Sequence, residues 1–201
     1  MVSGKSIRCV LTDRELQVIV ILGVVNYMVF RNIHHINVWR LTPAHVPRQF
    51  FIYLEPGSII AIIGSCLAGP IAGMAFGLVA WNPVIIPEVL IVVKIAQFVS
   101  IGYLHKKIQP PYNIFAIPVG TIITLIVHPT IVGYVLFKKL FIHLFWFQNI
   151  AFQTVVAFLV YIVLRLITPK LFSWVNPKHD YTLKIPYLTK KSKKNTKNEK
   201  K

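Results

Sequence analysis

A small side chain recurs at every fourth position through the most apolar stretch of the chain. The positions are Gly57, Ala61, Ser65, Gly69, Gly73 and Gly77. Because four residues are close to one helical turn, these positions share a helical face along which another backbone can approach closely. Helices in lipid pack through such faces, since lipid provides no hydrophobic drive for their association. No charged residue lies between 56 and 87. The stripe therefore predicts membrane helices that pack against other helices.

Composition supports the same class and separates the chain into two parts. Charged residues are 14% of the 201 residues, whereas a soluble domain carries about a quarter. The net charge is +16, and much of the excess lies in the Lys-rich residues 179–201. We expect one transmembrane domain over 1–178 and a disordered, cytoplasmic basic tail over 179–201, because such a run is too polar to fold alone. Anionic membrane lipid, rather than nucleic acid, is its expected neighbour.

Apolar segments separated by prolines and charges predict an all-α membrane protein with a bundle of six transmembrane helices. The expected helices cover 16–30, 52–68, 70–81, 85–104, 114–137 and 149–167. As one helix, residues 51–81 would be about 45 Å long against a hydrocarbon core of about 30 Å. We therefore predict a break at Gly69-Pro70, where proline interrupts the helix. The alternative is one kinked helix over Phe51–Trp81, which would give five helices.

An even number of helices places both termini on one side of the membrane. The Lys-rich tail assigns that side to the cytoplasm, because basic residues stay on the cytoplasmic side. The sequence thus predicts a multi-pass protein of the cell membrane with both termini cytoplasmic.

Lys94 is the most informative polar residue, because it lies near the middle of the expected helix 85–104. A lysine at the bilayer centre costs about 2.5–3.5 kcal/mol, so a partner or a water-filled cavity is expected. Gln97 lies on nearly the same face. Glu88 is six residues away and points about 120° from Lys94, so the two cannot pair along the helix. Glu55 is either the partner of Lys94 or a loop residue near a pocket mouth.

Other polar side chains are expected in the outer half of the same bundle. A few convergent polar groups with aromatic residues at the mouth are typical of a small-molecule pocket. The predicted substrate-binding residues are Glu88, Lys94, Gln97, Thr124, His128, Asn149, Gln153, Trp81 and Asn82. Structural roles are the alternative for some of them. Thr124 could bond back to its own helix, His128 could satisfy a carbonyl freed by Pro129, and Asn149 could cap its helix.

Motifs of catalysis are absent from the sequence. It contains no GxxxxGK[ST], HExxH or GxSxG pattern. Three histidines, His34, His35 and His45, share one polar segment without a cysteine or acidic residue among them. We therefore expect a non-enzyme with no catalytic residues, no metal site and no cofactor, and any ATP-driven role would need separate ATPase subunits.

The run Leu67-Ala-Gly-Pro-Ile-Ala-Gly-Met-Ala-Phe-Gly77 resembles a segment of the substrate-binding S components of energy-coupling factor (ECF) transporters. Residues 100–107 resemble the small-residue exit of their fourth helix into a basic loop, and Asn149 fits the opening of their sixth. The resemblance implies a substrate-specific subunit of an importer, which captures a vitamin or similar small molecule from outside. It also implies two kinds of partner, a transmembrane coupling protein and ATPase subunits, besides membrane lipid.

In that family the pocket is built from the fourth to sixth helices and the outer loops, while the first three helices meet the coupling protein. Their first helix commonly carries Ala-x-x-x-Ala, where this chain has Gly23, Asn26 and Tyr27. The candidate packing residues are Gly69, Gly73, Gly77 and Gly23, which pack either inside the subunit or against a partner. The start Met1-Val2-Ser3 differs from the Met-His start of the cobalt and nickel members. A non-transporting membrane scaffold or assembly subunit, with Lys94 merely paired inside the bundle, is the alternative function.

Overall fold

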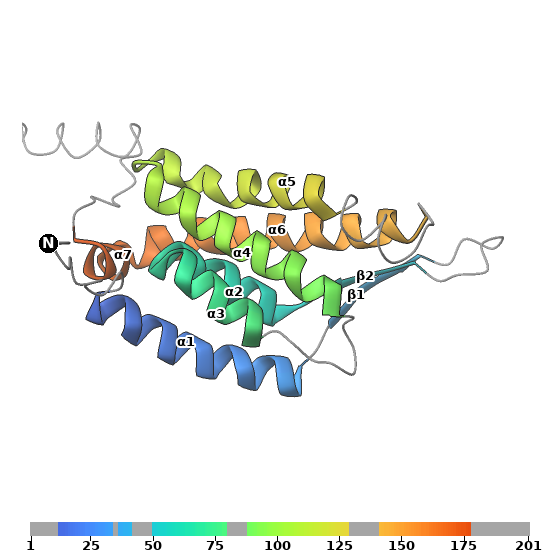
Figure 1. Ribbon diagram of the computed structural model, residues 1–201, viewed down its shortest axis with the longest axis horizontal. Coiled ribbons are helices and arrows are strands. Elements are labelled where there is room, and N and C mark those ends of the chain that lie inside the picture. The colour runs from blue at the N-terminus through green and yellow to red at the C-terminus, as the bar shows by residue number, and fades with distance from the viewer. Residues whose placement is uncertain (1–11, 34–35, 42–49, 80–87, 129–140, 178–201) are drawn as a thin grey trace, which may run out of the picture.

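The computed structural model describes residues 12–33, 36–41, 50–79, 88–128 and 141–177 (Figure 1). Its elements in chain order are α1 (Asp13–Asn32), β1 (Ile36–Leu41), β2 (Phe50–Leu54), α2 (Pro56–Ala68), α3 (Pro70–Val79), α4 (Glu88–Lys107), the short 3-10 helix η1 (Tyr112–Phe115), α5 (Ala116–His128), α6 (Phe141–Ile167) and α7 (Pro169–Val175). Helices α1 to α6 run back and forth along one axis (Figure 1). We call the end at which α1 begins and α6 finishes the terminal end, and the end that carries β1 and β2 the hairpin end.

The helical class and the break at Gly69-Pro70 are confirmed. Helix α2 ends at Ala68, Gly69 has φ +86°, and α3 begins at Pro70. Glycine tolerates this left-handed conformation without steric cost, and proline at the first helical position loses no hydrogen bond. The chain reverses there, and α2 and α3 pack against each other as separate helices (Figure 1). The single kinked helix over Phe51–Trp81 is therefore wrong.

The strand pair is the element that the sequence reasoning missed. Strands β1 and β2 pair antiparallel, with Ile36 opposite Leu54 and Leu41 opposite Phe50. The apolar run Phe50–Leu54 was expected to lead into a helix starting at 52, but the helix begins only at Pro56. A short apolar run fits a strand and a buried helix equally well, and proline at the first helical position fixes the boundary.

The small-residue stripe forms the contact between α3 and α4, the most extensive contact between two described elements. Gly69, Gly73 and Gly77 are all buried. A Cβ atom on Gly73 would lie 2.5 Å from the carbonyl carbon and oxygen of Phe98. From the other side, a Cβ on Gly102 would lie 2.6 Å from the carbonyl carbon of Gly69. The two backbones are thus in contact, which only glycine at these positions allows.

A second close contact joins α1, α2 and α3 through Phe76. The ring is fully buried and lies against Gly64, so a Cβ on Gly64 would collide with it. On the other side, a Cβ on Gly23 would stand 3.9 Å from the same ring, which is ordinary van der Waals distance. The four glycines predicted to pack are Gly69, Gly73, Gly77 and Gly23, and each lies beside another helix of this chain. The contacts that the structure shows for them are therefore within the subunit.

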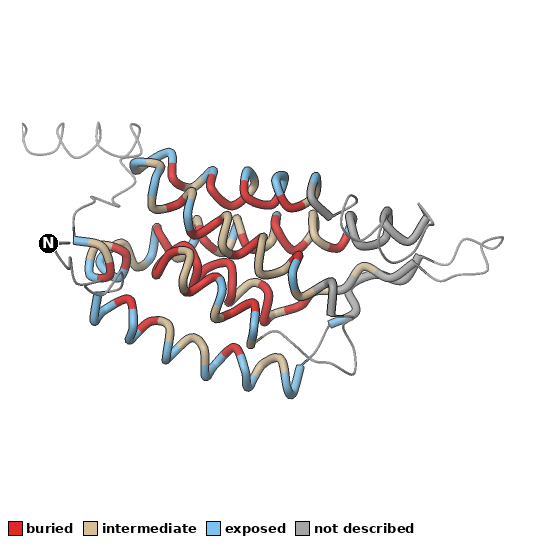
Figure 2. The backbone as a smooth tube through the Cα atoms, in the orientation of Figure 1, coloured by how far each residue is buried: buried red, intermediate tan, exposed pale blue. Residues whose placement is uncertain are grey.

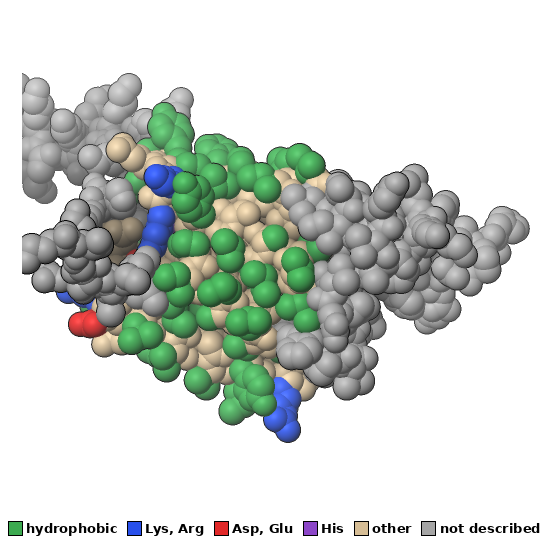
Figure 3. Space-filling view, in the orientation of Figure 1, with side chains coloured by type: hydrophobic (Ala, Val, Ile, Leu, Met, Phe, Trp, Pro, Cys, Tyr) green, Lys and Arg blue, Asp and Glu red, His purple; other side chains and the backbone are tan. Residues whose placement is uncertain are grey.

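The outer faces of the bundle are apolar, while its interior combines an apolar core with buried polar side chains. Figure 2 shows exposed positions along the outer sides of α1 and α5, and Figure 3 shows apolar side chains gathered over the face it views. The exposed large apolar residues of α1, α5 and α6 are Leu16, Val20, Ile21, Val24, Val25, Met28, Val119, Ile122, Ile123, Ile126, Val155, Leu159, Val163 and Leu166. Polar residues are buried between the helices, namely Asn26, Glu55, Ser58, Gln97, Thr121, Thr124, Asn149, Gln153 and Thr154. Among the described helices, one segment, residues 148–167 of α6, is both long enough and apolar enough to cross a membrane.

Asn26 on α1 is fully buried, and neither atom of its amide has a hydrogen-bond partner among the described residues. An unpaired buried amide costs about 1–3 kcal/mol. We expect Asn26→Leu, which keeps a similar volume, to raise the unfolding temperature of the purified protein. Gln17→Leu on the exposed side of the same helix is the matched control and is expected to change it little. A lower unfolding temperature for Asn26→Leu would show that this amide does have a partner.

Candidate functional site

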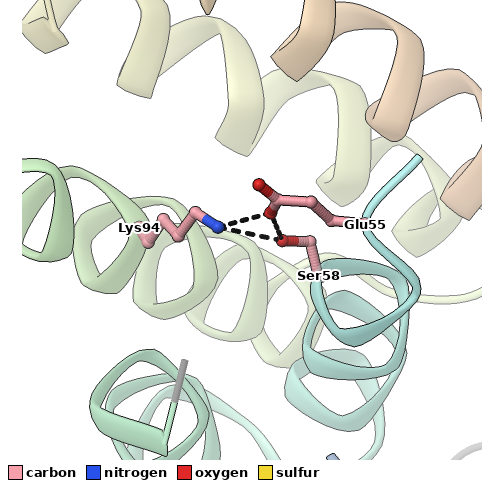
Figure 4. A network of polar contacts seen from close by, with 3 residues as sticks. All are labelled: Glu55, Ser58 and Lys94. Atoms are coloured by element: carbon pink, nitrogen blue, oxygen red, sulfur yellow. Dashed lines mark hydrogen bonds and ion pairs between the residues drawn. The ribbon is translucent and has the colours of Figure 1, made fainter. Parts of the chain in front are cut away.

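Lys94 forms an ion pair with Glu55, and Ser58 completes the cluster (Figure 4). The Lys94 ammonium donates to Oε2 of Glu55 and lies 3.4 Å from Oγ of Ser58. The Ser58 hydroxyl donates to the same Oε2 at 2.6 Å. The side chains of Lys94 and Glu55 are 14% and 10% exposed. The prediction that Lys94 needs a partner is confirmed. Two roles were expected for Glu55, partner of Lys94 or loop residue near a pocket mouth, and it is the partner.

The elements that position this cluster meet near the hairpin end. Glu55 is the N-cap residue of α2, immediately after β2, where the helix dipole favours a carboxylate. Ser58, one helical turn further on, therefore faces it. Lys94 comes from α4, and its ammonium lies 5.5 Å from the centroid of the Phe30 ring on α1. Phe30 in turn lies against Gly57, where a Cβ would collide with the ring.

A second polar cluster connects α4, α5 and α6. The Gln97 amide donates to Oγ1 of Thr121 at 3.1 Å, and Oγ1 of Thr154 lies 3.1 Å from the same oxygen. Gln97, Thr121 and Thr154 are all buried. Thr124 is one of the predicted site residues, and its hydroxyl donates to the carbonyl of Gly120 on its own helix at 3.0 Å. This bond is the structural role that the sequence left open for Thr124 as the alternative to substrate binding.

Asn149 and Gln153 lie one turn apart on α6, and both are buried. The predicted start of the helix at residue 149 is wrong, because α6 begins at Phe141. Asn149 therefore lies inside the helix, and the capping role considered for it is excluded. Helix α6 contacts β2, α2 and α5, so these amides lie on a helix that borders both polar clusters.

Four of the predicted site residues have no described side chain. Trp81 and Asn82 lie outside the described residues. Glu88 is the first residue of α4 and His128 the last of α5, and their backbones alone are described. The predicted tail 179–201 also lies outside the described residues. Sequence reasoning missed Ser58, Phe30 and Thr154. Only Ser58 has a local signal, because it lies three residues after the N-cap residue Glu55 and so within reach of its carboxylate.

Arg165 forms a buried network at the terminal end. It is 1% exposed and donates to Oδ1 of Asn113 at 2.9 Å. Because a guanidinium only donates, Oδ1 must face Arg165, and the Asn113 amide nitrogen then donates to Nε2 of His105 at 3.1 Å. The hydroxyl of Tyr161 lies 2.6 Å from the same Nε2.

A second ion pair lies at the same end. Glu15 caps the start of α1 together with Thr12 and pairs with Lys106 at the end of α4. The Lys106 side chain packs over Gly69 so closely that a Cβ atom on this glycine would collide with it. The first turn of α1, the α2–α3 turn and the last turn of α4 are thus joined at one place.

The comparisons with known proteins add no assignment. No family model, curated protein or solved structure matches the chain. Among the described residues, no group of three or more histidine, cysteine or acidic side chains is placed to hold a metal ion.

Proposed function

We propose that the chain is a multi-pass membrane protein in which α1 to α6 cross the bilayer. The exposed apolar faces of α1, α5 and α6 support this, because exposed leucine, isoleucine and valine are stable against lipid, while buried polar groups need partners inside the bundle. Helices α1 and α4 have 20 residues each, or about 30 Å at 1.5 Å per residue, which matches the hydrocarbon core. The shorter α2 is largely buried, while α3 buries one face against its neighbours and exposes Met74 and Leu78.

The terminal end is proposed to face the cytoplasm. Arg14 donates to the carbonyl of Trp174 at 2.7 Å and lies 5.5 Å from the centroid of its ring. Lys107 lies 5.8 Å from the centroid of the Tyr103 ring, and Lys170 is exposed. Lysine, arginine and aromatic residues together are typical of a membrane interface, and basic residues favour the cytoplasmic side. The hairpin end then faces outward.

The proposed function is substrate capture for an ECF-type importer. The observation that carries it is the position of the charged pair Glu55–Lys94 and the buried amides of α4 and α6, which lie between the helices of the bundle. Such groups are expensive in a membrane and commonly mark a substrate pathway. The sequence resemblance of residues 67–77 to S components suggests the class of importer. A coupling protein and ATPase subunits would then be its partners.

One observation favours the alternative, a non-transporting scaffold or assembly subunit. Lys94 is already paired within the chain, and a paired lysine can serve the stability of the bundle alone. The two functions differ in whether the bundle binds a small molecule.

Ligand binding is therefore the decisive test. We expect a vitamin or similar metabolite from a small-molecule library to raise the unfolding temperature of the protein in nanodiscs, since a ligand at 100 times its Kd stabilises by about 2.7 kcal/mol. Gln97→Leu should weaken that ligand about tenfold, because it removes a buried polar contact. Ser65→Ala is the matched control, since the Ser65 hydroxyl donates to the carbonyl of Ala61 on its own helix. If no metabolite stabilises the protein, substrate capture is refuted and the scaffold function stands.

A further inference from the structure

The cluster of Glu55, Lys94 and Ser58 has no net charge, and one oxygen of its carboxylate receives no hydrogen bond from the described residues. The hydrogen bonds in Figure 4 all end on Oε2 of Glu55 or on Ser58, and Oε1 receives none of them. Oε1 also points away from Lys94 and Ser58 (Figure 4). A carboxylate oxygen only accepts, so this atom is suited to a ligand group that carries N–H or O–H donors.

The Lys94 ammonium can receive an acceptor at the same place. Its contact with Oγ of Ser58 is 3.4 Å long, at the limit of a hydrogen bond, whereas its contact with Glu55 is direct. A ligand oxygen could therefore replace Ser58 without breaking the ion pair. The cluster thus offers a carboxylate oxygen and an ammonium N–H side by side.

The charge of the ligand follows from the neutrality of the cluster. A singly charged ligand would leave an unbalanced charge between the helices, and the effective penalty for a buried ion is several kcal/mol. A ligand with no net charge avoids this penalty. If it carries both charges close together, they alternate in sign with those of Glu55 and Lys94, so each charged group lies beside an opposite one.

We propose that this cluster binds a zwitterion whose ammonium and carboxylate are as close as in an α-amino acid, the ammonium on Oε1 of Glu55 and the carboxylate on Lys94. The proposal rests on the proposed function and names its substrate class. The amides of Gln97 and Gln153, buried on the helices beside this cluster, would serve the neutral polar part of the molecule.

The test compares three forms of one skeleton. An α-amino acid, its amide and its N-acetyl derivative supply the zwitterion, the cation and the anion, and sets with aliphatic, aromatic and polar side chains cover the skeletons. Binding to the full-length protein in nanodiscs is measured by thermal shift and calorimetry. The zwitterion of at least one set should bind about tenfold or more tighter than both charged forms, because only it leaves no unpaired charge.

Two results separate the failure of this inference from that of the proposed function. A charged form that binds as tightly as its zwitterion overturns the inference, as does stabilisation by a library metabolite while no amino acid binds. In both cases substrate capture survives. If neither the amino acids nor any library metabolite binds, both proposals fail.

A neutral double variant tests the role of the two charges. Glu55→Gln together with Lys94→Gln keeps the cluster uncharged and able to hydrogen-bond, and its unfolding temperature reports whether it folds. The three forms of the skeleton should then bind within about threefold of one another, because no fixed charge discriminates them. Ser65→Ala should keep the preference for the zwitterion. An unchanged preference in the double variant would overturn the assignment to Glu55 and Lys94.

Discussion

Gly73→Leu is expected to force α3 away from α4 and to destabilise the protein strongly. The new Cβ would lie 2.5 Å from the backbone of Phe98, which cannot rotate away as a side chain can. Overpacking of this kind costs about 3 kcal/mol or more, and we expect the unfolding temperature to fall by about 10 °C. Thermal unfolding of the purified protein in one detergent measures the effect.

Gly23→Ala is the control for this prediction. The nearest atom to its new Cβ is 3.9 Å away on the Phe76 ring, so nothing has to move. Alanine also favours the helix by up to about 1 kcal/mol over glycine. The unfolding temperature should be unchanged or higher. Equal stability of Gly73→Leu and the wild type would contradict the backbone contact between α3 and α4.

Asn113→Leu is expected to have the second large effect. It removes one acceptor of a buried guanidinium and a donor to His105 at the same time. A hydrogen bond to a charged group contributes about 1.5–3 kcal/mol. We therefore expect a loss of about 3 kcal/mol in the free energy of unfolding, measured by denaturant titration.

Two further variants make this result specific. Asn32→Leu removes an exposed side-chain bond to the carbonyl of Met28 and should cost little. Adding Arg165→Met to Asn113→Leu should recover part of the stability, because no charge then remains buried. If Asn113→Leu and Asn32→Leu cost the same, the network around Arg165 does not stabilise the protein.

Features with a local physical cause could be predicted from the sequence. The Gly69-Pro70 break follows from the length of the apolar run and from proline's missing donor. That Lys94 has a partner follows from the cost of a lysine in an apolar helix. Glu55 lies 39 residues away, so the sequence could not decide whether it is this partner or a loop residue. The small-residue stripe predicted close helix packing, and the glycines at α3 and α4 provide it.

Features that depend on distant partners could not be predicted. The inward turn of Arg165 requires Asn113, 52 residues earlier, and neither residue signals the other. Thr154 joins Gln97 only because α4, α5 and α6 meet, and its neighbour Gln153 was the more conspicuous candidate. The start of α6 at Phe141 and the strand Phe50–Leu54 were mistaken because apolar periodicity does not mark boundaries in short or uniformly apolar runs.

The ion pair between Glu15 and Lys106 has a mechanical consequence. It fastens the first turn of α1 to the last turn of α4 across the left-handed glycine that reverses the chain between α2 and α3. Swinging α1 outward at the terminal end would have to pull the ammonium off the buried carboxylate and off Gly69 together. At the hairpin end, the ion pair between Glu55 and Lys94 joins α2 to α4 and does not include α1, whose Phe30 ring packs against Gly57 and lies 5.5 Å from the Lys94 ammonium. Among the described residues, α1 is therefore tied to α4 by opposite charges at the terminal end and held by packing of its side chains at the hairpin end.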